Sequence, residues 1–331
     1  MIRIDGSYGE GGGQILRSSI ALSCITGEDV EIYNIRASRP KPGLAAQHLK
    51  GIETAKVLCN GRVEGLRVGS TRVIFRPGRI RVRDLKVDIG TAGSITLLLQ
   101  TLMPPLLHAG RECRIEITGG TDVKWSPSVD YFAFVLGDVL KEMGAEFEIE
   151  LIRRGYYPRG GGKIVVKILS GELKGKKFKR VECCTVRGIS HCSNLPAHVA
   201  ERQAKSAEEV LREHGLQSEI RTEVRRDVST GSGITLFCKY KGSISYGEKG
   251  KPAEKVGGGA ALEIIGEIGS PGTFDRHLAD QVMIPGVIAR GVTVYSSTEI
   301  TRHILSNAYV INSFIDGSVE IKDDTIRISG I

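Results

Sequence analysis

Residues 11–35 read GGGQILRSSIALSCITGEDVEIYNI, a stretch that places a helix directly before a strand. The helical part is predicted to end at Gly27, because glycine readily adopts the left-handed conformation that closes a helix. The residues after Gly27 alternate between apolar and polar side chains, which is typical of a strand. A further strand is expected at the N-terminal side, before a glycine-rich turn that leads into this helix. The N-terminal segment is therefore predicted to form an α/β unit.

The same succession of elements occurs three times along the chain. The helix and following strand recur in residues 92–120, AGSITLLLQTLMPPLLHAGRECRIEITGG, and in residues 276–298, RHLADQVMIPGVIARGVTVYSST. A second half, made of a helix, a glycine, a short strand, a polar turn and a strand, recurs in residues 44–75, 127–155 and 302–330. Common βα units resemble one another by chance, but agreement in element order across all three copies favours a true repeat. The predicted fold is α/β, with three tandem βαβαββ units.

The third unit carries an insertion. We expect its first strand near Lys179 to Ile189, whereas its first helix begins only at Arg276. The segment between them contains a helical pattern in residues 196–215, an alternating strand in residues 234–242 and a further helix around Lys251 to Gly269. Nothing in this segment indicates catalysis.

These patterns predict a large domain formed by residues 1–186 and 273–331, with a smaller α/β domain inserted at residues 187–272. The chain has 331 residues, of which 40% are hydrophobic and 25% charged, so it is long enough for two such domains. The seven cysteines show no CxxC spacing, which indicates neither a disulfide framework nor a zinc ribbon.

No stretch of the sequence has the pattern of a membrane span or a secretory signal. The N-terminal MIRIDGSYGE contains charges and glycines, and the longest apolar stretch, Ile95 to Leu107, is broken by Gln100 and by prolines. We therefore expect a cytoplasmic protein with no membrane association. The formal net charge of +8 favours an anionic partner such as nucleic acid, although excess Lys and Arg often form only a solvated surface.

A glycine-rich loop, DGSYGEGGGQ at residues 5–14, precedes the first helix and can offer backbone N–H groups to a phosphate. Its spacing is not GxGxxG, so a dinucleotide fingerprint is poorly supported. Glu10 within this loop would repel a polyphosphate unless a divalent cation lay between them. Glu10 is thus a candidate metal ligand, and a solvated loop carboxylate is the alternative.

A basic loop, RASRPKPG at residues 36–43, is followed by Gln47 and His48 on the next predicted helix. Bringing two phosphate charges to about 4 Å costs roughly 1 kcal/mol per charge pair in bulk water and about 4 kcal/mol at an effective dielectric of 20. A site that joins two anions therefore needs clustered cations. Candidates for these cations are Arg17, Arg36, Arg39 and Lys41, and a solvated surface is the alternative.

The third unit places HLADQ at residues 277–281 and TRHILSN at residues 301–307 at the starts of its two helices. A histidine in the first turn of a helix tends to be neutral, because the positive helix end disfavours the imidazolium, and neutral imidazole is the nucleophilic form. His303 is therefore a candidate nucleophile. A hydrogen-bonded structural histidine is the alternative.

Together these segments resemble the RNA 3′-terminal phosphate cyclase family, in members that retain the nucleophilic histidine. The resemblance rests on DGSYGEGGGQILR, RASRPKPGLAAQH, GTAGS followed by LLLQ, GGTD, HLADQ and TRHILSN, and it includes PAHVAER in the inserted segment. Several long motifs in the same order are more specific than any one of them. The resemblance implies three repeats similar to the C-terminal domain of translation initiation factor three, with an inserted α/β domain.

For activity, the resemblance implies ATP-dependent conversion of an RNA 3′-terminal phosphate to a 2′,3′-cyclic phosphate. The histidine matching His303 would attack the α-phosphorus of ATP to form a covalent histidine–AMP adduct and release pyrophosphate. AMP would pass to the RNA 3′-phosphate, and the neighbouring 2′-hydroxyl would then displace it. A phosphate monoester has no good leaving group until AMP is attached, so this division of the reaction is chemically sensible.

The resemblance also assigns roles to individual residues. Glu10 matches the family's metal-binding carboxylate, for Mg²⁺ or Mn²⁺. Residues matching the ATP site are Gln100, His277, Leu278, Ala279, Asp280 and Gln281, with Pro127 and Asp130 beside the adenosine pocket. Residues matching the phosphate and RNA-end region are Arg17, Arg36, Arg39, Lys41, Gln47 and His48. Many relatives carry tyrosine at the position of His277, so the contact made there is open.

Two other classes of function stay in competition at this stage. One is a non-catalytic cyclase-like protein that binds RNA or assists ribosome assembly, and its relatives lack the nucleophilic histidine that His303 matches. The other is an enolpyruvyl transferase, whose six repeats are too many for a chain of this length. A homodimer is compatible with the sequence, which leaves the cellular RNA substrate, the metal, the oligomeric state and the role of the insertion open.

Overall fold

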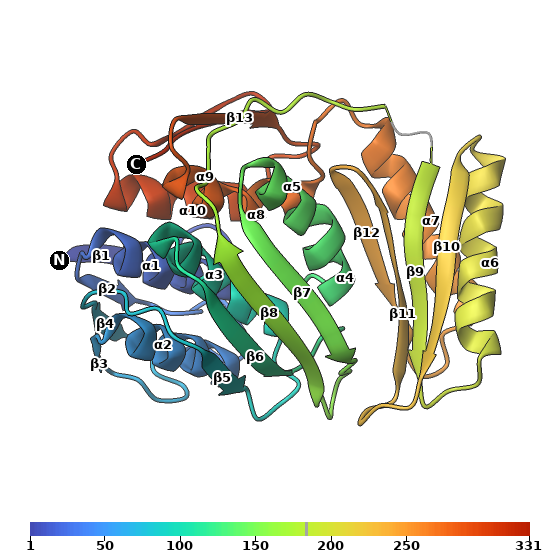
Figure 1. The fold of residues 1–331 in the computed structure, drawn as a ribbon, viewed down its shortest axis with the longest axis horizontal. Coiled ribbons are helices and arrows are strands. Elements are labelled where there is room, and N and C mark those ends of the chain that lie inside the picture. The colour runs from blue at the N-terminus through green and yellow to red at the C-terminus, as the bar shows by residue number, and fades with distance from the viewer. Residues whose placement is uncertain (183–184) are drawn as a thin grey trace.

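The computed structural model describes residues 1–182 and 185–331. Its described residues form four small sheets with helices packed against them (Figure 1), so the α/β class predicted from the sequence is confirmed. The first unit contains β1 (Ile2–Asp5), α1 (Gly13–Thr26), β2 (Val30–Tyr33), α2 (Ala46–Cys59), β3 (Arg62–Glu64) and β4 (Val73–Arg76). As predicted, α1 ends at Gly27, which has a left-handed φ of 78°.

The second unit repeats this order with one irregular helix. It contains β5 (Leu85–Asp88), α3 (Ile95–Ala109), β6 (Cys113–Gly119), α4 (Val129–Tyr131), a π-helical turn (Phe132–Leu136), α5 (Gly137–Glu142), β7 (Glu146–Arg153) and β8 (Gly162–Ser170). The strand orders of the two sheets, β1-β2-β4-β3 and β5-β6-β8-β7, are equivalent. In both, the first pair of strands is parallel and the remaining pairs are antiparallel.

The third unit contains α8 (Arg276–Gln281), α9 (Met283–Ile288), β13 (Val292–Ser296), α10 (Arg302–Phe314), β14 (Val319–Lys322) and β15 (Thr325–Ser329). Its sheet has the order β13-β15-β14. Lys174 and Lys177 form parallel bridges to Arg290 and Val294, beside β13, where the other units have their first strand. All three units therefore share one element order among the described residues, whereas the likeness to the initiation-factor domain stays a prediction.

The first strand of the third unit was predicted in the wrong place. Of the residues expected to form it, near Lys179 to Ile189, those from residue 185 onward lie instead in β9 (Thr185–Ser193), which pairs with the inserted strands on both sides. The rest of the insertion comprises α6 (His198–Glu213), β10 (Gln217–Arg225), β11 (Gly231–Cys238), β12 (Lys241–Tyr246) and α7 (Ala253–Gly269). Its sheet has the order β10-β9-β11-β12.

The insertion shows two further differences from the sequence prediction. Residues 234–242 form two strands, because the chain turns at Lys239, where φ is 52°. The inserted domain was predicted to begin at residue 187, whereas β9 begins two residues earlier. The domain boundary itself remains a prediction. Residues 183 and 184, which fall within the predicted first strand, lie outside the described part of the chain.

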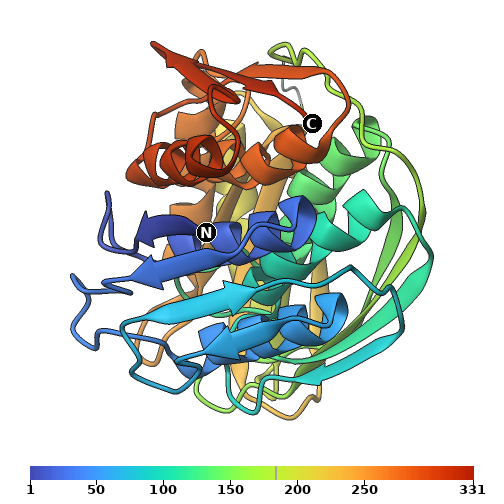
Figure 2. The same ribbon diagram turned by 90° about the vertical axis from the view of Figure 1, so that its left-hand side faces the viewer.

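Two apolar cores hold the described residues together. One runs through all three units, and the other lies in the insertion around Val186, Leu211, Ile234 and Val256. In the larger core, α1 packs against both α3 and α10, so helices from all three units meet. Figure 2 shows the blue first unit directly beneath the red third unit, with their helices facing each other. None of the helices in the described part of the chain combines the length and apolar character needed to cross a membrane.

Candidate active site

The glycine-rich loop after β1 holds Glu10 against the start of α10. Gly9 and Gly11, on either side of Glu10, have φ values of 61° and 59°. A Cβ on Gly9 would lie 2.5 Å from Ser306 Oγ, so only glycine allows this approach to α10. The Glu10 carboxylate contacts His303 Nε2, and Arg39 donates to its other oxygen at 2.7 Å. The first and third units are thus joined through Glu10.

His303 lies in the first turn of α10, as predicted from TRHILSN. The preceding Thr301 caps this helix by accepting a hydrogen bond from the Ile304 backbone N–H. On the imidazole, Nδ1 lies 3.6 Å from Asp280 Oδ2 of α8, while Nε2 faces Glu10. The nucleophile candidate is therefore placed between two carboxylates from different units.

These carboxylates shift the pKa of His303 in the direction opposite to that expected from its helix position alone. The Asp280 side chain raises the pKa of His303 most strongly, and the charges of Asp280 and Glu10 outweigh the opposing effects of burial and Arg17. Burial works to raise the pKa of Glu10, but His303 and Arg39 lower it overall. The direction of this shift is opposite to the one expected from the helix start alone, because close carboxylates act more strongly than a helix dipole.

The raised pKa of His303 predicts a specific pH dependence of stability. A group with a folded-state pKa above its unfolded value, about 6.5 for histidine, stabilises fully below that value. This contribution is lost as the pH rises through the folded-state pKa. We expect the free energy of unfolding of the wild type to exceed that of His303→Gln by about 0.2–1 kcal/mol at acidic pH, since the side chain is partly exposed, and by less at alkaline pH.

Urea titrations at a series of pH values measure this difference. The control pair is Glu10→Gln against the double variant Glu10→Gln/His303→Gln, for which the pH dependence should shrink because one carboxylate partner is absent. A difference that grows with rising pH would contradict the geometry around His303.

Asp280 is fixed by residues that the sequence analysis did not single out. Gln14 Nε2 donates to Asp280 Oδ2 at 2.6 Å, and Asn307 Nδ2 donates to the Asp280 carbonyl at 2.9 Å. Ser18 Oγ in turn donates to Asn307 Oδ1 at 2.7 Å. Gln14 and Ser18 lie on α1 and Asn307 lies on α10, so helices from two units hold Asp280 in place. The sequence did offer a signal for two of these residues. Gln14 lies within DGSYGEGGGQILR and Asn307 lies within TRHILSN, about one helical turn from the candidate residues Arg17 and His303.

Arg17 lies between two hollows of the protein surface and lines both. Burial lowers the pKa of Arg17 to about 10, and the charge of Asp280 opposes this shift, so the guanidinium stays cationic at neutral pH. The Gln47 hollow, defined by Arg17, Gln47, His48, Ser94 and Thr101 together with apolar neighbours, encloses about 310 Å³. The Asp280 hollow, defined by Gln14, Arg17, Gln100, Asp280, Gln281 and Asn307 together with apolar side chains, encloses about 480 Å³.

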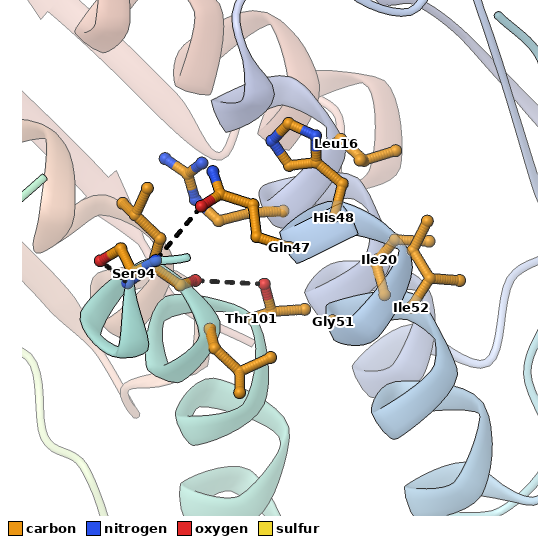
Figure 3. A pocket seen from close by; sticks show the side chains of 11 residues that line it. Leu16, Ile20, Gln47, His48, Gly51, Ile52, Ser94 and Thr101 are labelled. Carbon is orange, nitrogen blue, oxygen red and sulfur yellow. Dashed lines mark hydrogen bonds between the residues drawn. The ribbon is translucent and has the colours of Figure 1, made fainter. Parts of the chain in front are cut away.

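Figure 3 shows the Gln47 hollow between α2 and the start of α3. Gln47 Oε1 accepts a hydrogen bond from the Ser94 backbone N–H at 3.2 Å. Burial lowers the pKa of His48 to about 3, and the nearby Arg17 and Arg36 charges act in the same direction, so this imidazole is neutral. The Ser94 and Leu97 N–H groups at the start of α3 are already hydrogen-bonded, so the Arg17 cation is the feature that suits the Gln47 hollow to an anionic group.

The Asp280 hollow brings together the polar residues predicted for ATP with a mainly apolar wall. Gln100 Nε2 donates to Gln281 Oε1 at 3.1 Å, and Met103, Phe132 and Ile284 line the hollow. Small-molecule sites are typically apolar with a few placed polar groups, and the lining of this hollow has that character. The other residues of HLADQ do not line this hollow. Leu278 and Ala279 are buried in the core, and His277 is exposed.

The basic loop approaches the same region from the first unit. Arg36 has a left-handed φ of 55° and donates from Nη1 to the Gly43 carbonyl at 2.9 Å, which closes the loop on itself. Arg39 reaches Glu10, as described above. Lys41 is exposed and forms no ion pair among the described residues. The structure thus brings Arg39 to His303 through Glu10, while Lys41 stays at the surface.

Pro127 and Asp130 line neither hollow. The Pro127 carbonyl accepts a hydrogen bond from Thr96 Oγ1, and Asp130 is buried against Arg154 at 2.9 Å. Together with Asp122 and His191, Asp130 offers ligand atoms that lie within 4.8 Å of one another. The Arg154 guanidinium already supplies a cation to both carboxylates, so the fit for a metal ion is poorer than at Glu10.

The arrangement around His303 can perform chemistry on phosphates. It combines an imidazole at a helix start, a partly exposed carboxylate, and a buried arginine between two hollows. These are the parts of an enzyme that transfers nucleotidyl or phosphoryl groups through a histidine.

Comparison with known proteins identifies the family. The family model described as RNA 3′-terminal phosphate cyclase matches residues 8–321, and the chain belongs to this family. A protein named RNA 3′-terminal phosphate cyclase from Archaeoglobus fulgidus is 56% identical over 99% of this chain and 100% of its own length. Proteins of the same name from Methanococcoides burtonii and Pyrococcus furiosus are 47% and 49% identical, covering 99% and 97% of this chain and 99% and 95% of their own lengths.

A solved structure, the enolpyruvyl transferase NikO from Streptomyces tendae, matches with a TM-score of 0.42 at 9% identity. The match covers 99% of this chain and 48% of that chain. A likeness this low bears on neither fold nor function.

Proposed function

We propose that this chain converts the 3′-terminal phosphate of RNA to a 2′,3′-cyclic phosphate at the expense of ATP, and the name of its relatives, RNA 3′-terminal phosphate cyclase, supports a cyclase function. The single observation that carries the proposal is the position of His303. Its imidazole lies between Glu10 and Asp280, beside Arg17, which lines both hollows. A histidine in this position can take a nucleotidyl group from one bound phosphate and pass it to another.

In the first step, His303 Nε2 attacks the α-phosphorus of ATP. A P–N bond forms, the bond to the pyrophosphate oxygen breaks, and pyrophosphate leaves. Asp280 faces Nδ1 and stabilises the positive charge that develops on the ring. Because Nε2 contacts Glu10 before the reaction, the proton at this atom must leave and Glu10 must turn away before attack.

In the second step, an oxygen of the RNA 3′-phosphate attacks the phosphorus of the histidine–AMP adduct. The P–N bond breaks, and the RNA carries a 3′-pp-5′-A end. The neighbouring 2′-hydroxyl then attacks the RNA phosphorus, losing its proton, and AMP leaves with the electrons of the broken P–O bond. Arg17 offsets the charge of the phosphates brought together in these steps.

The two hollows fit the two substrates. The Asp280 hollow has the apolar wall that suits an adenosine, with Gln100 and Gln281 as polar contacts. The Gln47 hollow, with the Arg17 cation and the neutral His48, suits the RNA phosphate end. Arg36, Arg39 and Lys41 then provide further positive charge beside it.

Glu10 is the residue that fits a divalent cation such as Mg²⁺ or Mn²⁺. Its carboxylate is partly exposed and is neutralised by Arg39 and His303, which marks a place that favours positive charge. Glu10 would hold such a hard cation, which would supply neutralisation of the triphosphate charge.

The alternative of a non-catalytic RNA-binding factor is disfavoured by His303 itself, since such a factor needs no imidazole between two carboxylates. A homodimer remains compatible with the chain.

The test uses purified full-length protein, α-labelled ATP and Mg²⁺ or Mn²⁺. We expect a covalent label that is stable in alkali and labile in acid, as for a phosphoramidate, and that disappears when EDTA removes the metal. An RNA with a 3′-phosphate should become resistant to phosphatase only when ATP is present. Absence of both the label and the protection would favour the RNA-binding factor.

A further inference from the structure

Two large aromatic side chains are exposed on the edge of the second unit. Trp125, the single tryptophan of the chain, is 93% exposed, and Tyr157 is 77% exposed. Trp125 also has a left-handed φ of 61°, a conformation that is costly for a non-glycine residue. Aromatic side chains presented to solvent in this way mark places where a partner binds.

Trp125 and Tyr157 emerge from neighbouring backbone segments. Asp122 and Tyr156 form a parallel bridge, so Trp125 follows one segment by three residues and Tyr157 follows the other by one. Arg159 Nη1 donates to the Val228 carbonyl at 2.9 Å, which adds the β10–β11 loop of the insertion to the same edge. In Figure 1 the chain leaves β6, β7 and β10 at this common lower edge.

This edge is continuous with the Gln47 hollow. A Cβ on Gly160, in the loop that carries Tyr157, would lie 2.8 Å from Ala92 Cα, so this loop packs directly on the one before α3. A Cβ on Gly93, the next residue, would lie 3.0 Å from Gln47 Cβ. A path of touching residues thus leads from the proposed RNA-end site to the exposed aromatic pair.

The charges along this edge favour a polyanion. Arg159 and Arg226 are exposed and form no ion pair among the described residues, whereas Lys124 is paired with Glu248 at 2.8 Å. Unpaired arginines beside exposed aromatic rings are the pattern that binds single-stranded nucleic acid, with bases stacked on the rings and phosphates beside the cations. A protein partner would require a larger apolar surface than two aromatic rings and Val228 provide.

We propose that the aromatic edge, defined by Trp125, Tyr157, Arg159 and Arg226, binds the single-stranded RNA that leads to the 3′-phosphate. This inference rests on the proposed function and adds a second binding region outside the two hollows. It also gives the insertion a role, because the β10–β11 loop forms one side of the edge.

The lone tryptophan makes the first test specific, since indole fluorescence excited at its red edge reports only on Trp125. We expect a 3′-phosphorylated decanucleotide RNA to quench this emission through base stacking. A 3′-phosphorylated dinucleotide, which occupies only the Gln47 hollow, should leave the emission nearly unchanged. Equal responses to the two RNAs, or no response to either, would overturn the inference.

The second test compares Trp125→Ala and Tyr157→Ala with Leu262→Ala, an exposed apolar residue on α7, as the matched control. For the decanucleotide, we expect each aromatic variant to raise KM about tenfold with kcat unchanged, given roughly 1–3 kcal/mol per stacked base. For the dinucleotide, all variants should match the wild type, and Trp125→Phe should restore most of the affinity for the longer RNA.

The two proposals fail in different ways. If the wild type cyclises the dinucleotide but Trp125→Ala leaves KM for the decanucleotide unchanged, the aromatic edge has another role and only this inference falls. If the wild type cyclises neither RNA, the proposed function falls and this inference falls with it.

Discussion

Replacement of His303 by asparagine is expected to abolish covalent labelling by α-labelled ATP, with a loss of at least about 10³-fold in the rate of RNA cyclisation. Asparagine keeps a polar group of similar reach to Nδ1 but lacks the nucleophilic Nε2. The loss should persist at saturating ATP and RNA, because the variant lacks the bond-forming atom and keeps both hollows. Gel autoradiography and a phosphatase-protection assay measure the two quantities.

A pre-adenylylated RNA separates this chemical role from a structural one. RNA that already carries the 3′-pp-5′-A end needs only attack by its own 2′-hydroxyl, so His303→Asn should still convert it to the cyclic end. His198→Asn, at an exposed histidine on α6, is the matched control and should label like the wild type. Normal labelling of His303→Asn would remove His303 as the nucleophile, and failure with the pre-adenylylated RNA would point to a damaged site.

The sequence predicted the units well where the signal is local. Gly27 and Gly110 both adopt left-handed φ values of 78° and 60° after a helix, as expected for glycines that follow an apolar helical pattern. The first strand of the third unit was placed wrongly because its sequence signal is also only local. Alternation of side chains around Ile189 predicts a strand but not which sheet it joins, and β9 pairs with β10 and β11 of the insertion.

The electrostatics of the candidate site could not be predicted from local sequence. A helix start next to His303 is a local feature, whereas Glu10 and Asp280 reach it from distant parts of the chain. The pKa of His303 depends on those tertiary contacts, which raise it where the helix start alone was expected to lower it. Gln14 escaped notice because a glutamine in the first turn of a helix has no local property that marks it as a partner of Asp280.

Arg154 is the clearest case of a residue whose importance only the fold reveals. In the sequence, Arg153 and Arg154 are adjacent basic residues typical of a solvated strand end. In the structure, Arg154 is fully buried and ion-paired with Asp122, Asp130 and Glu223 at 2.9–3.2 Å, where the second unit meets the insertion. Its Nη1 and Nη2 face the second unit, and its Nε faces Glu223 of β10.

We expect Arg154→Met to lower the free energy of unfolding by about 3–5 kcal/mol at neutral pH, because methionine leaves three carboxylates without their shared cation. Urea unfolding monitored by circular dichroism measures this loss. Arg153→Met is the matched control, since the neighbouring Arg153 is only partly buried and donates to the Gly161 carbonyl, and it should cost under about 1 kcal/mol.

The pH dependence of this loss identifies its electrostatic origin. Although burial acts in the opposite direction, Arg154 and Arg225 lower the pKa of Glu223 to about 2. A carboxylate with a lowered folded-state pKa stabilises the fold above its unfolded value, about 4.3 for glutamate, and loses that contribution as the pH falls towards the folded value. The difference in the free energy of unfolding between wild type and Arg154→Met should therefore be largest above about pH 5 and shrink as the pH falls towards 2. In this range the wild type loses the contribution of Glu223. In the variant, protonation removes the charge of the carboxylates that lack a cation. A loss that is independent of pH would show that Arg154 stabilises the junction by packing alone.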